Sequence, residues 1–322
     1  MSSGADAHSR RADAWQPVVS HDATSLALQR FDPPSPLSAF ITSYWLYQSG
    51  PLPHARERLL PTGIAQLVID LSGDGFSLPD LLPDPLPVGV STTDSGVEPH
   101  NESHRTTHAV LHGPYTRPFL LGTDRPVWRL GVNFAPVGVS RFFRLPASDL
   151  QDADVPLDAL WGTRAAEELG ERLAQARRPA EQFGVLERLL RRQLMRFPAP
   201  HPAVGHAVRA FSTTPRGGAL DHRVRVASVA EEAGLSVGGL TRLFKEEVGL
   251  TPKRYIRIQR FLRVLRRTRK GRPAPWARLA VEGGYYDQAH LINEFHALAG
   301  VSPCVYLRDR SERSPTDLIV VE

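Results

Sequence analysis

Residues 283–303 read GGYYDQAHLINEFHALAGVSP, and this stretch decides the fold of the C-terminal third of the chain. Its apolar residues recur at helical spacing on one face: Leu291, Phe295 and Leu298. Asp287 precedes them as a good N-cap. Gly284 and Gly300 stand where the chain must turn before and after such a helix. The stretch therefore predicts a turn, one short helix and a second turn.

The same arrangement occurs twice. VASVAEEAG (226–234) recurs as WARLAVEGG (276–284), 50 residues later, and GLTPKRYIR (249–257) recurs as GVSPCVYLR (300–308), 51 residues later. One residue is therefore inserted in the second turn. Each unit predicts a short helix, a glycine turn and a second short helix, for which Ser236 is the expected N-cap in the first unit. Two copies are too few for a solenoid, so we interpret them as a duplicated supersecondary unit.

Helix, glycine turn, helix is the plan of the helix-turn-helix motif, which places its second helix in a DNA major groove. A helical hairpin that binds no nucleic acid would fit a single unit equally well. Charge favours DNA, because residues 216–272 carry 15 Lys and Arg against 5 Asp and Glu, whereas the whole chain has a net charge of only +5. This asymmetry indicates a polyanion-binding region attached to a net acidic remainder.

Two stretches carry a specific resemblance: LSVGGLTRLFKEEVGLTPKRYIRIQRF and GGYYDQAHLINEFHALAGVSPCVYLR. With them, the segment from about 205 to 308 resembles the AraC family of transcriptional regulators, whose DNA-binding domain is two helix-turn-helix units joined by a long helix. The N-terminal half, with ERLLPTGIAQLVI and GVNFAPVGVSRFFRLPASDLQDADVPLDALWG, resembles the uncharacterised N-terminal domain of a subgroup of that family. This second resemblance implies no particular ligand.

The first recognition helix is expected over about 237–247. The resemblance places base contacts at Gly238, Thr241 and Arg242. Arg242 can bind guanine O6 and N7 with two hydrogen bonds, unless it pairs with Glu246 instead. Gly238 offers no side chain, and we expect Lys245 to contact a phosphate.

The second recognition helix is expected over about 288–298, and its positions off the buried face are Gln288, Ala289, His290, Ile292, Asn293 and His296. Asn293 suits adenine N6 and N7. Ile292 suits either a thymine methyl group or packing against the N-terminal domain. His290 suits either a phosphate or a packed corner.

A joining helix is expected from Pro252 to about Thr268, with Tyr255, Ile258, Leu262 and Leu265 as its core stripe. We expect most of the arginines around this stripe in solvent or on phosphates, where they would add salt-sensitive affinity for any sequence: Arg254, Arg257, Arg260, Arg263, Arg266 and Arg267.

The fold class predicted is α+β. Short apolar or alternating runs between residues 25 and 150 indicate a mainly β, sensor-like domain, and helical spacing from Thr163 indicates helices after it. The C-terminal domain is predicted to be all-α. We expect the following division: a disordered tail over 1–20, a regulatory or sensor domain over 21–200, the DNA-binding domain over 201–310 and a tail over 311–322.

Signals for other functions are weak. GLSVG (234–238) fits the nucleophile-elbow pattern of hydrolases, but a helix precedes it instead of a strand, so no enzyme is expected. Four histidines recur every fourth residue and could bind Zn²⁺ or Ni²⁺ on a helix: His100, His104, His108 and His112. Their surroundings indicate a loop that enters a strand, so neither a metal nor a cofactor is expected.

Two further features bear on partners and location. The chain has a single cysteine, Cys304, so an intrachain disulfide is excluded, and this fits the cytoplasm. Cys304 itself is interpreted as an inert small residue. No apolar run approaches the roughly 18 residues of a membrane span. Tyr44, Trp45 and Tyr47 either line an effector pocket or belong to the core.

The sequence thus predicts a sequence-specific, DNA-binding transcriptional regulator that inserts two recognition helices into successive major grooves. The alternative is a metal- or small-molecule-binding sensor whose helical domain mainly mediates protein interaction. The expected partners are double-stranded DNA, an unknown small-molecule effector, RNA polymerase and a second copy of the chain, with no membrane.

Overall fold

The structure, a computed structural model, describes residues 17–20, 27–73, 75–76, 107–194, 199–212, 225–268, 275–310 and 318–321. The disordered tail expected over 1–20 lies outside these residues up to position 16. Residues 17–20 form a strand. His100 and His104 also lie outside the described residues.

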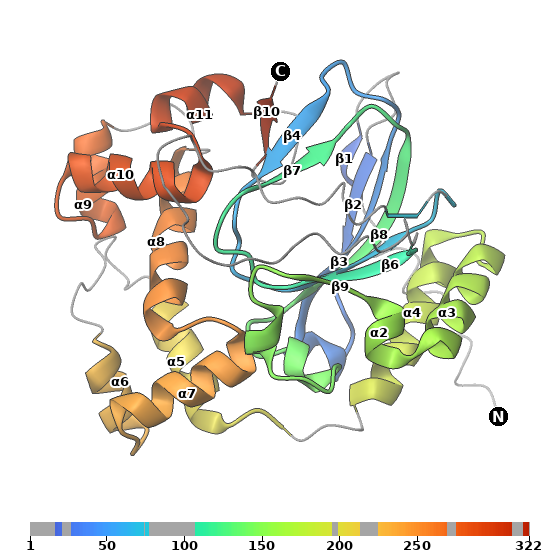
Figure 1. Cartoon of the computed structure of the whole chain (residues 1–322), viewed down its shortest axis with the longest axis horizontal. Coiled ribbons are helices and arrows are strands. Elements are labelled where there is room, and N and C mark those ends of the chain that lie inside the picture. Colours follow the sequence, from blue (N-terminus) through green and yellow to red (C-terminus); the bar gives the residue numbers. More distant parts are fainter. Residues whose placement is uncertain are drawn as a thin grey trace, which may run out of the picture.

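The N-terminal half contains a seven-stranded antiparallel sheet (Figure 1). Its strands, in spatial order, are β1 (Pro17–Ser20), β2 (Ala27–Phe31), β3 (Ile41–Ser49), β8 (Val127–Phe134), β5 (Gln66–Asp70), β6 (Ala109–His112) and β9 (Asp154–Pro156). The long strands β3 and β8 form its centre, with Tyr44 opposite Val132. Because side chains alternate along a strand, the two faces of this sheet have different neighbours.

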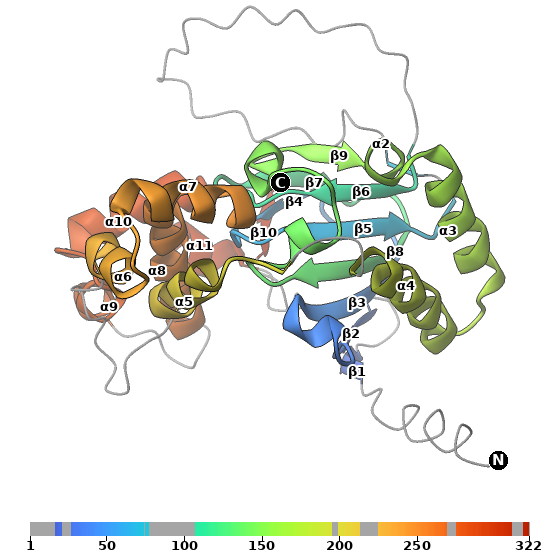
Figure 2. The ribbon, with the colours of Figure 1, turned by 90° about the horizontal axis from the view of Figure 1, so that it is seen from below.

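One face of the sheet is covered by helices α2 (Leu157–Trp161), α3 (Thr163–Gln175) and α4 (Pro179–Leu194), as Figure 2 shows. Leu130, Val132 and Phe134 of β8 belong to the same buried core as Phe183 and Leu186 of α4. The 3₁₀ helices η1 (Leu37–Ala39), η3 (Val139–Arg141) and η4 (Ala147–Leu150) close this core. The helices predicted after Thr163 are therefore confirmed, and the structure shows that they cover one face of the sheet.

A second sheet has three antiparallel strands in the order β10 (Leu318–Val321), β4 (Arg56–Leu59) and β7 (Phe119–Gly122). Strand β10 lies in the segment 311–322, which was expected to be a tail. Its backbone pairs with strand β4 of the N-terminal domain. A β ladder thus joins the residues that follow the helical domain to the N-terminal domain.

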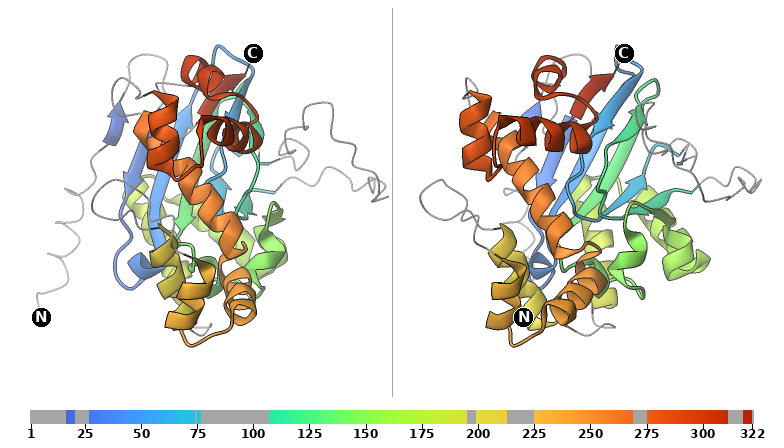
Figure 3. Two further views of the ribbon diagram at one scale, coloured as in Figure 1. Left: turned by 90° about the vertical axis from the view of Figure 1, so that its left-hand side faces the viewer. Right: turned by 60° about the vertical axis from the view of Figure 1, so that its left-hand side comes forward.

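The C-terminal half is helical over the described residues, apart from β10. It contains α5 (Pro202–Ser212), α6 (Val226–Glu232), α7 (Val237–Val248), α8 (Pro252–Thr268), α9 (Trp276–Gly283), α10 (Gln288–Ala299) and α11 (Pro303–Asp309). Figure 3 shows α8 running from the α6–α7 pair to the α9–α10 pair. A second buried core with Phe244, Tyr255, Phe261 and Phe295 joins α6, α7 and α10 to α8, and a smaller one joins Leu279 of α9 to Val264 of α8. The predicted α+β fold class is confirmed.

Candidate nucleic-acid interface

Side-chain caps start the second helix of each unit. The hydroxyl of Ser236 accepts a hydrogen bond from the backbone N–H of Gly239 at 3.0 Å, and Asp287 Oδ1 accepts one from the N–H of His290 at 2.7 Å. Such caps satisfy donors that have no partner within the helix. Both predicted N-caps are therefore confirmed.

Glycines end the helices as predicted. Gly234, Gly249, Gly284 and Gly300 have φ of +67°, +86°, +77° and +71°, the left-handed region that glycine enters without a steric penalty. After the first helix of each unit, the residue that follows the left-handed glycine donates back to a carbonyl: Leu235 to Ala230 at 2.8 Å and Tyr285 to Ala280 at 2.9 Å. The two turns thus share one geometry, that of a Schellman motif.

Helix α7 buries Leu240, Phe244 and Val248 and turns its opposite face outward. Gly238, Arg242 and Lys245 are exposed there, and Thr241 is partly exposed. Arg242 Nη1 lies 3.3 Å from Glu246 Oε1, one helical turn away, while the arginine side chain remains 68% exposed. An exposed pair of this kind contributes little free energy, so Arg242 is free to exchange Glu246 for another acceptor.

Helix α10 buries Leu291, Phe295 and Leu298, and the predicted contact positions lie off that face. Ile292 is partly buried, and the others are exposed: Gln288, Ala289, His290, Asn293 and His296. For His290 the alternatives were a phosphate contact and a packed corner. Its ring packs edge-on against Tyr285 at a centroid distance of 5.4 Å and yet stays exposed, so both remain compatible with its position. Its Nδ1 accepts the backbone N–H of Tyr286 at 3.3 Å, so Nε2 carries the proton of the neutral ring.

The arginines of α8 differ from the prediction. Arg257 Nε lies 2.6 Å from Glu294 Oε2 of α10, and Arg260 Nη1 donates to the carbonyl of Gly284 at 3.2 Å. Arg254 Nη1 donates to Gln151 Oε1 of the N-terminal domain at 2.9 Å. The expectation of solvent or phosphate was therefore wrong for Arg257 and Arg260, whereas Arg254 is exposed to solvent in spite of its bond to Gln151.

The other arginines of α8 include one that is buried and two that are exposed. Arg263 is only 6% exposed, and burial lowers the pKa of its guanidinium. Arg266 and Arg267 are both exposed, and Arg267 lies 3.9 Å from Glu282. Helix α8 packs against several neighbouring elements, so some of its long side chains reach those elements while others remain in solvent.

Tyr286 is not among the predicted contact residues, yet it is the large apolar or aromatic side chain with the highest exposure in the described part of the chain, at 91%. The signal that could have found it is the residue inserted in the second turn, because the repeat leaves one position there without a counterpart.

The aromatic cluster of β3 is split between the two faces of its sheet. Tyr44 is buried in the core under the helices, whereas Trp45 packs on the other face with Val68 and Leu121. Trp45 Nε1 donates to Asn133 Oδ1 at 3.1 Å. One continuous pocket wall of Tyr44, Trp45 and Tyr47 is therefore excluded by the alternation of the strand.

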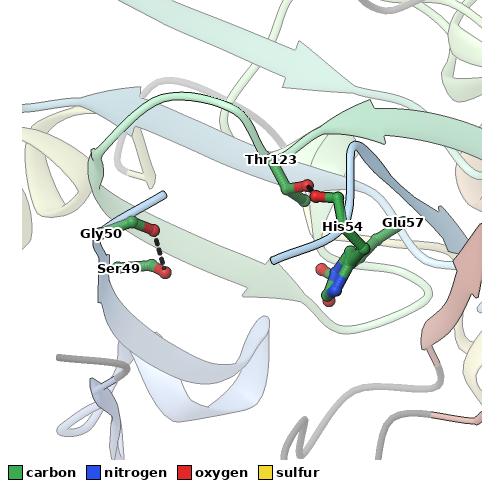
Figure 4. Close-up of polar contacts among 5 residues, drawn as sticks. All are labelled: Ser49, Gly50, His54, Glu57 and Thr123. Carbon is green, nitrogen blue, oxygen red and sulfur yellow. Dashed lines mark hydrogen bonds and ion pairs between the residues drawn. The ribbon is translucent and has the colours of Figure 1, made fainter. Parts of the chain in front are cut away.

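Figure 4 shows polar contacts of His54, Glu57 and Thr123 beside strand β4. His54 Nε2 donates to Glu57 Oε1 at 3.1 Å, and the Thr123 hydroxyl donates to the carbonyl of His54. Burial raises the pKa of the Glu57 carboxyl, against the hydrogen bond from His54, and the pKa of Tyr47 is raised by burial and by the charge of Glu57. Nearby, His112 Nδ1 lies 2.5 Å from Asp154 Oδ1.

The histidine series does not form a ligand set in the part that the structure describes. His108 is exposed, and His112 lies in β6, paired with Asp154. Across the described ranges, no three His, Cys, Asp or Glu side chains are grouped so that they could hold a metal ion. Within the same ranges, no helix combines the length and apolar character of a membrane span.

Two helix-turn-helix units on one long helix, each with a capped and outward-facing recognition helix, define a DNA-binding domain of the transcription regulators. Residues 229–309 match the family described as a helix-turn-helix domain, and residues 29–156 match a domain of unknown function, DUF6597. The chain therefore combines a helix-turn-helix domain with an N-terminal domain of unknown function.

Solved structures with similarity to the chain include regulators from several bacteria. The C-terminal domain of AraT, a response regulator from Geobacillus stearothermophilus, is 24% identical over 36% of this chain and 94% of that chain, with a TM-score of 0.31. A DNA-binding transcriptional dual regulator from Escherichia coli K-12 is 22% identical over 34% and 95%, with a TM-score of 0.28. ToxT from Vibrio cholerae is 12% identical over 88% and 97%, with a TM-score of 0.37. None of the curated proteins compared with the chain matches it.

Proposed function

We propose that the chain binds duplex DNA sequence-specifically by inserting α7 and α10 into successive major grooves. The observation that carries the proposal is the pair of exposed faces on α7 and α10, held at the two ends of α8. Helix α8 has 17 residues. It therefore spans about 25 Å, which is compatible with the roughly 34 Å between successive major grooves on one side of the DNA.

The two helices would read different bases. Arg242 offers the bidentate donor pair that suits guanine, and Asn293 the donor and acceptor that suit adenine. Ile292 would contact a thymine methyl group. Lys245 and His290 would contact phosphates, and Gly238, Thr241, Gln288 and Ala289 would complete the contact surface.

Salt dependence tests the proposal most simply. The affinity of the full chain for a duplex should fall by orders of magnitude between about 50 and 200 mM salt if several phosphates are contacted. A folded chain without affinity for any duplex at low salt would contradict the proposal.

For the N-terminal domain we propose regulation by a small-molecule effector that binds between its two sheets. The buried side chains of Glu57, Asp70 and His112 support this location, because buried ionisable groups are costly and mark functional sites. A thermal-shift screen of small molecules and divalent metals against the full chain tests it, since a ligand of the folded state raises its melting temperature. RNA polymerase and a second copy of the chain are further proposed partners, which pull-down and sedimentation experiments test.

A further inference from the structure

Tyr286 is the extra residue of the second turn. In the first unit the turn runs from Gly234 through Leu235 directly to the N-cap Ser236. In the second unit Tyr285 makes the same backbone bond as Leu235, and Tyr286 then stands before the N-cap Asp287. The repeat therefore assigns Tyr286 no structural counterpart.

The turn holds Tyr286 firmly although its side chain is exposed. Its own N–H donates to His290 Nδ1 at 3.3 Å, and the next residue, Asp287, accepts the His290 N–H at 2.7 Å. On the other side, Tyr285 N–H is bonded to Ala280 at 2.9 Å. Because the backbone is fixed on both sides, the ring projects from a defined point beside the first turn of α10.

An exposed aromatic ring at this point suits a DNA backbone. When the first residues of a recognition helix contact base edges, the turn before the helix lies near a backbone strand. Tyrosine is one of the side chains that bond phosphate oxygens, and its ring offers an apolar surface to a sugar. The exposed His290 in the same turn adds a second donor at Nε2.

We propose that Tyr286 is a DNA-contact residue of the second unit, with its ring against a deoxyribose and its hydroxyl donating to a phosphate oxygen. This inference rests on the proposed function and assigns the second unit an additional role. Ala289 and Ile292 offer no hydrogen bonds to bases, so α10 would depend more than α7 on backbone contacts. The second unit would thus hold the register of the chain on DNA while α7 supplies most of the base discrimination.

The test measures binding of the full chain to a pool of random duplexes at several salt concentrations. Tyr286→Ala should weaken binding about 3- to 10-fold for all sequences, the range expected for one hydrogen bond and its packing. The affinity of Tyr286→Phe should lie between that of Tyr286→Ala and that of the wild type. Because tyrosine is uncharged, neither variant should change the slope of log affinity against log salt, whereas Lys245→Ala should reduce it by about 1.

The matched control is Val281→Ala, which removes another exposed apolar side chain, 60% exposed, from α9 of the same unit. It should leave affinity unchanged. Equal binding by the wild type and Tyr286→Ala would overturn the inference and leave the proposed function intact. A loss confined to certain base pairs would overturn the backbone contact, and a wild type that binds no duplex would overturn both proposals.

Discussion

Gly234 and Gly249 both end helices in the left-handed conformation, but their surroundings differ. A Cβ at Gly234 would meet nothing within 4 Å. A Cβ at Gly249 would lie 2.6 Å from the carbonyl oxygen of Ala147 and 2.7 Å from Pro114, both in the N-terminal domain. The first glycine is therefore required by its backbone alone, and the second also by contact between the domains.

Alanine at the two positions should separate these requirements. Gly234→Ala should lower the free energy of unfolding by about 1–2 kcal/mol, the cost of a left-handed alanine. Gly249→Ala should cost roughly a further 1–3 kcal/mol, because the contact with Ala147 and Pro114 must yield. Denaturant unfolding of the full chain measures both values, and equal losses would show that the domain contact is absent in solution.

Glu57 should make stability depend on pH. Its folded pKa is raised above the ordinary 4.5 by burial, so the protonated form is favoured in the folded state. The free energy of unfolding should then decrease as the pH rises from about 4.5 through the folded pKa, and Glu57→Gln should flatten that decrease.

Glu181 serves as the control for Glu57, because its pKa is shifted in the opposite direction. Hydrogen bonds from Arg178 and from the backbone lower the pKa of Glu181, so its contribution is lost as the pH falls. Glu181→Gln should therefore leave the decrease above pH 4.5 in place. An unfolding free energy with the same pH dependence in Glu57→Gln and in the wild type would refute the assignment to Glu57.

At the scale of elements, the caps and glycine turns could be predicted from the sequence because they act through local backbone geometry. Ser236, Asp287 and the four glycines needed no knowledge of distant residues. The predicted contact residues were also placed off the buried faces of α7 and α10 for this reason, although their contacts with DNA stay predictions.

The arginines of α8 could not be predicted in the same way. A helical pattern shows which face is apolar, but it does not show that other elements pack around the remaining faces as well. The α8 arginines therefore looked like a phosphate-binding surface, while Arg257 and Arg260 in fact hold the second unit. Part of the positive charge counted in the sequence of this helix is therefore bonded within the protein.

The Arg257–Glu294 pair provides the test at this scale. A double-mutant cycle of Arg257→Ala and Glu294→Ala should give a coupling of about 0.5–1 kcal/mol in the free energy of unfolding, since both groups are partly exposed. Arg266→Ala, which changes an exposed arginine of the same helix, should leave stability unchanged. Absence of coupling would return Arg257 to the set of candidate phosphate contacts.

At the scale of the whole molecule, the N-terminal domain touches both units at equivalent points. Pro114 lies at Gly249 after α7, and Pro118 lies at Gly300 after α10, where a Cβ would be 3.6 Å away. The pairing of β10 with β4 adds a third connection. Such contacts between distant segments leave no periodic signal in a sequence, which is why the strands were foreseen but their order, β10 and these contacts were not.

Under the proposed function, these connections would link the effector site of the N-terminal domain to the two recognition helices. Residues 114–118 join β6 of one sheet to β7 of the other and contact the end of each recognition helix. A ligand that changes the spacing of the two sheets would therefore also change the spacing of α7 and α10. The domain boundary near residue 201 stays a prediction.

The central claim is that α7 and α10 read separate groups of base pairs. A binding selection on randomised duplexes with the wild type, Arg242→Ala and Asn293→Ala tests it most directly. The wild type should show two groups of preferred base pairs about ten base pairs apart. Arg242→Ala should relax one group at a cost of about 1–3 kcal/mol, and Asn293→Ala should relax the other. As a control, Arg172→Ala, in an exposed pair with Glu168 on α3, should change neither. Base preferences that stay the same in both recognition-helix variants would contradict the claim.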